Sequence, residues 1–72
     1  MRQVSDEHPR LHAALAAFEG VDVFTIYTNE RNVLVRFDGP ANPAYVFAEL
    51  NRQRLTPKGL GLMLHKQPGL NQ

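Results

Sequence analysis

The chain has 72 residues, the size of one small domain whose hydrophobic core leaves little stability to spare. It contains no Cys, which excludes disulfides and thiolate metal sites and fits a reducing compartment. The net charge is +1, but residues 1–38 are acidic overall, whereas residues 39–72 hold four basic residues against Glu49 alone. No apolar run is long enough to span a bilayer, and the first ten residues lack a signal-peptide core, so we expect a cytoplasmic protein.

The N-terminal segment predicts one amphipathic helix. With Asp6 as the N-cap, Pro9 falls in the first turn, where its missing N–H costs nothing. Gly20 is expected to end the helix. Whether Arg2–Val4 forms a short edge strand before it stays open. Apolar residues recur at i, i+3, i+4 and i+7, namely Leu11, Ala14, Leu15 and Phe18.

Residues 21–38 predict a β-hairpin, because two runs of β-branched and aromatic residues flank a polar segment with two Asn. Burying the alternate apolar residues of both strands together fixes the register. The loop then has an even number of residues, either Glu30-Arg31 or residues 29–32. We expect the longer loop, because Glu and Arg disfavour the positive φ of a two-residue turn. The expected pairs are Phe24 with Phe37, Ile26 with Val35, and Thr28 with Val33.

The second half predicts a helix and a strand. Asn42 and Pro43 suit the N-cap and first position of a helix that runs to about Arg54. The segment Leu60–Lys66 has Leu at every second position, which is typical of a strand with one buried face. Residues 67–72 are expected to form a frayed tail.

These elements define one α+β domain over residues 1–72, with two helices on one face of an antiparallel or mixed sheet of three to four strands. The order helix, strand, strand, helix, strand, with a short strand in front, resembles the β-α-β-β-α-β pattern of ferredoxin-like domains, complete or truncated. No motif indicates a particular family. The expected core consists of Leu15, Phe18, Phe24, Phe37, Phe47, Leu50 and Leu62.

Few residues are suited to catalysis, so we expect no enzyme. The single Ser is Ser5, at a helix cap, and no nucleophile elbow is present. The segment Gly59-Leu60-Gly61 precedes a strand and lacks the Lys-Ser/Thr ending of a phosphate loop. His8 and His12 have zinc-ligand spacing, but no third ligand is placed beside them, so we expect no metal and no cofactor. A small enzyme or metal-binding protein is therefore only a second alternative.

The basic second half supports an alternative function in nucleic-acid binding. The cations could line one side of the domain, and Tyr27 offers a ring for stacking on a single-stranded base. The glycine-aromatic signature of RNA-recognition domains is absent, and cations near a helix C-terminus also serve to complement its dipole. The residues of this alternative are Arg36, Arg52, Arg54, Lys58 and Lys66.

The function we expect first is protein binding through the sheet face that the helices leave open. Apolar and polar side chains alternate there, and such patches mark partner sites. A small chain also gains stability from association. We therefore expect a non-enzymatic regulatory module that binds another protein, or itself as a homodimer; a tail or loop of the same chain covering this face is the structural alternative. The expected partner-binding residues are Val23, Thr25, Tyr27, Leu34, Arg36, Met63 and His65.

Overall fold

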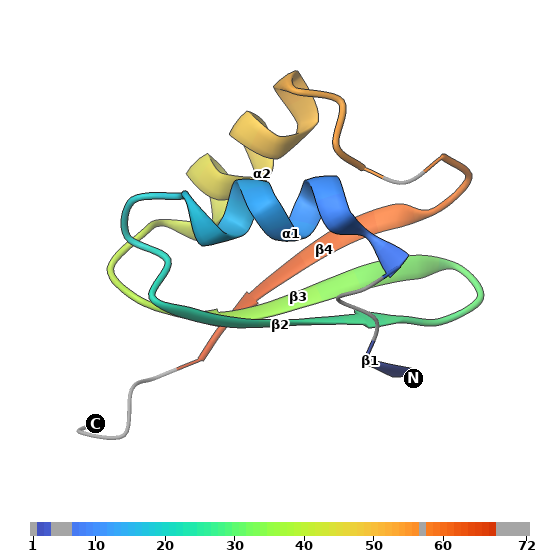
Figure 1. The fold of residues 1–72 in the computed structure, drawn as a ribbon, viewed down its shortest axis with the longest axis horizontal. Helices are drawn as coiled ribbons and strands as arrows, with labels where there is room; N and C mark the ends of the chain where they lie inside the picture. The colour runs from blue at the N-terminus through green and yellow to red at the C-terminus, as the bar shows by residue number, and fades with distance from the viewer. Residues whose placement is uncertain (1, 4–6, 57, 68–72) are drawn as a thin grey trace.

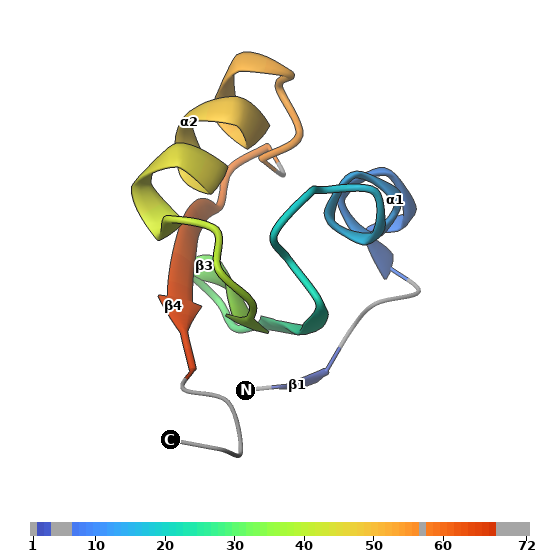
Figure 2. The ribbon, with the colours of Figure 1, turned by 90° about the vertical axis from the view of Figure 1, so that its left-hand side faces the viewer.

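The structure, a computed structural model, describes residues 2–3, 7–56 and 58–67. The strands are β1 (Arg2–Gln3), β2 (Val23–Thr28), β3 (Asn32–Asp38) and β4 (Gly61–Lys66), and the helices are α1 (Pro9–Ala16) and α2 (Pro43–Arg52). The sheet has the strand order β1-β2-β3-β4, and both helices lie on one of its faces (Figure 1). Figure 2 shows α2 on the side of β4, with α1 on the side away from it. The other face of the sheet therefore carries no helix.

The α+β class, the element order and the mixed sheet agree with the sequence analysis. β1, β2 and β3 pair antiparallel, whereas β3 and β4 pair parallel. Because β3 and β4 are direct neighbours joined through α2, they form an unsplit β-α-β unit. Ferredoxin-like sheets are built from split β-α-β units, in which another strand separates the two that a helix connects. The ferredoxin-like topology is therefore not confirmed.

The hairpin has the predicted register. Phe24 lies opposite Phe37, Ile26 opposite Val35, and Thr28 opposite Val33. This last pair encloses residues 29–32, as expected for the four-residue loop. The Asn29 side chain stabilises the turn, because its Oδ1 accepts hydrogen bonds from the backbone N–H groups of Arg31 and Asn32 at 2.8 and 2.9 Å. Neither Glu30 nor Arg31 has a positive φ.

The start of α1 differs from the prediction. The helix begins at Pro9 with His8 as its N-cap, and the predicted N-cap Asp6 lies outside the described residues, as does Val4. His8 cannot join the helix because a residue before Pro is pushed out of the α region, and its φ and ψ are −133° and 64°. The helix also ends early, at Ala16, so that Phe18 and Gly20 belong to the following loop.

The end of α2 is also earlier than predicted, at Arg52 instead of about Arg54. Arg54 adopts the left-handed conformation with φ of 57°, which stops the helix. The N–H of Leu55 then donates to the carbonyl of Leu50 at 3.0 Å, and that of Arg54 to Asn51 at 3.0 Å, which is the bonding of a Schellman motif. The last strand likewise starts at Gly61, one residue after the predicted Leu60.

The core lies between the sheet and the helices. Most predicted core residues are buried or packed against the core, but Phe47 is wrongly predicted, because 38% of its surface is exposed. The buried side of α2 consists of Val46 and Leu50, four residues apart, and Phe47 lies one helical step to the side of that line. The buried hydrophobic residues are Leu11, Leu15, Val21, Ile26, Val33, Val35, Phe37, Val46, Leu50 and Leu62.

Two loops cross at Gly20 and Gly39. The N–H of Ala41, just after Gly39, donates to the carbonyl of Gly20 at 2.9 Å, which joins the loop after α1 to the loop before α2. Both glycines have positive φ, 92° and 134°. A Cβ at Gly39 would overlap the carbonyl oxygen of Gly20. This crossing therefore requires glycine for its backbone conformation and for its space.

We predict that Gly39→Ala lowers the free energy of unfolding by roughly 2 kcal/mol or more, because it adds backbone strain and a clash with Gly20. Gly59→Ala is the matched control, since Gly59 also has positive φ, 82°, but its Cβ would meet nothing within 4 Å. That control should cost only about 1 kcal/mol. Urea unfolding of both variants gives the comparison. Equal losses would show that the loops do not cross closely.

Candidate protein-binding face of the sheet

The seven residues predicted to bind a partner lie on the same sheet face and form cross-strand rows. The paired residues Tyr27, Leu34 and Met63 make one row across β2, β3 and β4. The next row consists of Thr25, Arg36 and His65. Val23 is the first residue of β2 and lies opposite Asp38. An apolar row therefore lies beside a polar row that carries the positive charge of Arg36.

The side chains of this face differ in solvent exposure between its centre and its edges. Val23 and Met63 are among the most exposed large hydrophobic residues of the described chain, with 67% and 53% of their surfaces accessible. Leu34 and Tyr27, which lie between other strands, are half-buried by their neighbours. The alternate residues of β3, Val33, Val35 and Phe37, are buried under the helices. The face is thus a shallow apolar surface, open within the described part of the chain.

Arg36 lies at the centre of the polar row and has an unsatisfied donor. Its side chain is half-buried, and no described residue accepts a hydrogen bond from its buried Nε. A buried donor without an acceptor costs free energy, typically about 1–3 kcal/mol. A partner carrying a carboxylate or carbonyl at this point could supply the acceptor, because Arg presents planar donors that suit such groups.

The residues of the nucleic-acid alternative are not brought together on one surface. Arg36 lies on the open face, whereas Arg52 is the last residue of α2 and Arg54 lies two residues beyond it, in the layer on the opposite face. Lys58 precedes β4 and Lys66 ends it, which separates them by most of the length of that strand. The described structure therefore offers no continuous basic track along the sheet.

Arg52 is also engaged within the helix. Its guanidinium donates to the Glu49 carboxylate at 2.9 Å, on the exposed side of α2. The hydrogen bond from Arg52 lowers the pKa of the Glu49 carboxyl below its ordinary value, and the same hydrogen bond raises the pKa of Arg52. A phosphate would have to compete with this carboxylate for Arg52.

The histidines do not gather into a ligand set. His12 packs against the ring of Phe24, with centroids 5.0 Å apart, and His65 lies on the open sheet face. Within residues 2–3, 7–56 and 58–67, no group of three or more His, Cys, Asp or Glu side chains is placed to hold a metal ion. In the same residues, no helix has the length and apolar character needed to cross a membrane.

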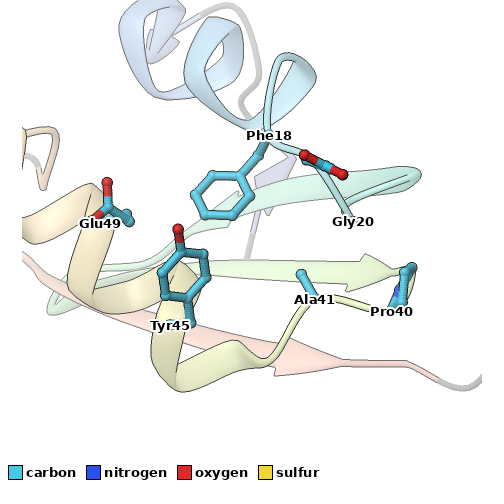
Figure 3. A pocket seen from close by; sticks show the side chains of 7 residues that line it. Phe18, Gly20, Pro40, Ala41, Tyr45 and Glu49 are labelled. Carbon is cyan, nitrogen blue, oxygen red and sulfur yellow. The ribbon is translucent and has the colours of Figure 1, made fainter.

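A groove between the two helices was not anticipated from the sequence. It has a volume of about 480 Å³ and lies where the end of α1 approaches the start of α2 (Figure 3). The rings of Phe18 and Tyr45 meet there edge to face, 5.8 Å between centroids. Glu19 and Glu49 stand at its rim, and the lining contains no nucleophile or cluster of convergent donors. The groove is therefore a junction where the aromatic pair joins the loop after α1 to α2.

Comparison with known proteins gives no relative: no protein-family model, no curated protein and no solved structure matches the chain. The function therefore has to be argued from the residues and their geometry.

We predict that Arg36→Met leaves the free energy of unfolding within about 1 kcal/mol of the wild-type value, because an unbranched apolar side chain of similar length removes an unsatisfied donor. Chemical unfolding of both proteins measures this. A loss of several kcal/mol would show instead that Arg36 has an essential partner within the chain.

Proposed function

We propose that the chain is a non-enzymatic protein-binding module that uses the open sheet face. The observation that supports this most is the apolar row Tyr27, Leu34 and Met63, which lies accessible on the face opposite both helices. Contiguous exposed apolar residues with a polar border are typical of partner sites. The module acts by presenting this surface, and it needs no cofactor.

The two rows define the chemistry of the partner. A complementary surface has apolar side chains over Leu34 and Met63 and an acceptor, best a carboxylate, over Arg36. Arg36 and His65 lie next to each other across β3 and β4 and favour an acidic group. The partner is therefore a protein surface with apolar residues beside an acidic one.

Nucleic-acid binding is less well supported, because such binding needs cations along a continuous path. The described structure distributes these cations over both faces and both ends of the domain. Of the residues named for this alternative, only Arg36 and Tyr27 lie on the sheet face that would hold bases.

We expect Leu34→Arg to abolish protein binding while leaving the fold intact. Leu34 is half-buried, so an Arg remains hydrated in the free chain but leaves an unpaired charge under a docked partner. The control is Ala13→Arg, which adds the same charge at an exposed position of α1. Recovery of bound proteins from a lysate of the source cells, identified by mass spectrometry, compares the wild type with both variants, and circular dichroism checks folding.

Leu34→Arg also distinguishes protein binding from nucleic-acid binding. If the face binds a protein, Leu34→Arg should remove that partner. If the face instead bound single-stranded nucleic acid, the added cation would strengthen salt-sensitive binding to oligonucleotides. A partner that Leu34→Arg retains, or stronger oligonucleotide binding by the variant, would contradict the proposal. So would unfolding of Leu34→Arg, because it would mean that this face is part of the core.

A further inference from the structure

Strand β4 leaves a row of backbone groups unpaired at the edge of the sheet. In its parallel pairing with β3, the N–H of Gly61 donates to Arg31 at 3.0 Å and the N–H of Gln67 donates to Phe37 at 2.7 Å. The odd-numbered residues of β4 therefore point their N–H and C=O groups toward β3. Those of Leu62, Leu64 and Lys66 point away from the sheet and have no partner among the described residues.

The usual protection of such an edge is sparse in β4. The strand is six residues long, contains no Pro and carries one Lys, at its last residue. Natural edge strands are commonly shortened, interrupted or charged, since an open edge is a template for another strand. The edge of β4 is thus suited to accept a further strand.

A helix surface beside the same edge is also uncovered. On α2, Ala44, Phe47, Ala48 and Asn51 recur at i, i+3, i+4 and i+7, are exposed and carry no charge. The opposite flank of α2 faces the loop after α1, because Tyr45 contacts Phe18 of that loop. α2 packs against β4, at the edge of the sheet away from α1 (Figure 2). Because Tyr45 and its flank face the loop after α1, the uncharged flank is directed toward the free edge.

We propose that a second copy of this chain docks on this edge, with the two β4 strands antiparallel. Leu64 then pairs with the same residue of the second copy, and Leu62 pairs with Lys66. Each of these facing pairs is a hydrogen-bonded pair of an antiparallel ladder, in which the two residues exchange both N–H···O=C bonds. All outward N–H and C=O groups of the three residues therefore find partners. The two four-stranded sheets become one continuous sheet, and the uncharged flanks of the two α2 helices meet above it.

A second copy is favoured as the occupant because both the edge of β4 and the uncharged flank of α2 can pair with an identical surface. A lone extended peptide would pair with β4 but leave Phe47 and its neighbours exposed, whereas a second copy brings an identical α2 flank. In the β3-α2-β4 unit α2 runs antiparallel to β4. In the proposed dimer, Phe47, near the middle of α2, then lies close to the two-fold axis that passes beside Leu64. The two Lys66 side chains start four residues apart, roughly 13 Å, so that salt screens their repulsion.

This dimer differs from one formed through the sheet faces, and it leaves the open face of each copy accessible. It does not depend on the proposed function, and separate variants test the two surfaces. Phe47→Lys alters the dimer edge, and Leu34→Arg alters the open face.

The first test measures mass in solution by analytical ultracentrifugation over a concentration series. The wild type and Ala13→Lys, which adds the same charge on α1, should reach twice the mass of one chain. Phe47→Lys should remain at one chain mass with unchanged circular dichroism, because it places like charges near the axis. Mixing Phe47→Lys with Phe47→Glu should restore the dimer.

The second test measures amide exchange by NMR. The N–H groups of Met63 and His65 point to β3 and should be protected in every variant, whereas that of Leu64 should lose its protection on dilution and in Phe47→Lys. A wild type that stays monomeric at every concentration, or a dimer that Leu34→Arg breaks and Phe47→Lys does not, would overturn the proposal. Failure of the mixed variants to associate would overturn the placement of Phe47 at the axis.

Discussion

Strand β3 pairs with β2 on one side and β4 on the other. The alternation of its side chains and backbone groups determines which residues form the core, the open face and the free edge. Val33, Val35 and Phe37 are buried at 0 to 1% exposure, so Leu34 and Arg36 must point to the opposite face. The odd residues of β3 also direct their backbone groups to β4, which forces the even residues of β4 to direct theirs outward. One register therefore defines the core, the open face and the free edge.

The same alternation explains what could be predicted from the sequence. The period of two in residues 21–38 and 60–66 depends on local chemistry, so the hairpin pairs and the seven residues of the open face were predictable. The start of α1 was predicted too early, although Pro9 disfavours a helical conformation of His8. The end of α2 was not predictable, because it depends on a left-handed conformation of Arg54, a residue that is not glycine. Phe47 looked like a core residue because it adjoins Val46; only the placement of α2 near the sheet edge leaves it exposed.

Strand order was the other feature that the sequence did not determine. The order of elements along the chain is compatible with more than one strand order in the sheet. Which order forms depends on whether β4 pairs with β3 or with another strand. Its position beside β3 follows from long-range packing of Leu62 and Leu64 under α2, which no local pattern encodes. The unpaired edge of β4 and its uncharged helix flank became visible only with that placement.

Both surfaces, the edge of β4 and the open sheet face, could add stability to a chain of 72 residues by association. Its core is small, and association is one of the few remaining sources of stability in a chain without Cys. Pairing at the edge would satisfy backbone groups, whereas docking on the open face would cover apolar side chains and supply an acceptor for Arg36. Because these surfaces are distinct, a dimer would present two open faces side by side.

The most direct test of this account is the accessibility of methyl groups on the two faces of the sheet. Relaxation of methyl signals by a neutral, soluble gadolinium chelate reports how closely solvent approaches each side chain. An open sheet face predicts strong relaxation for Val23, Leu34 and Met63 and weak relaxation for Val33, Val35 and Leu62, in monomer and dimer alike. Leu34 and Met63 methyls as protected as that of Val35 would contradict it, because the face described as open would then be covered.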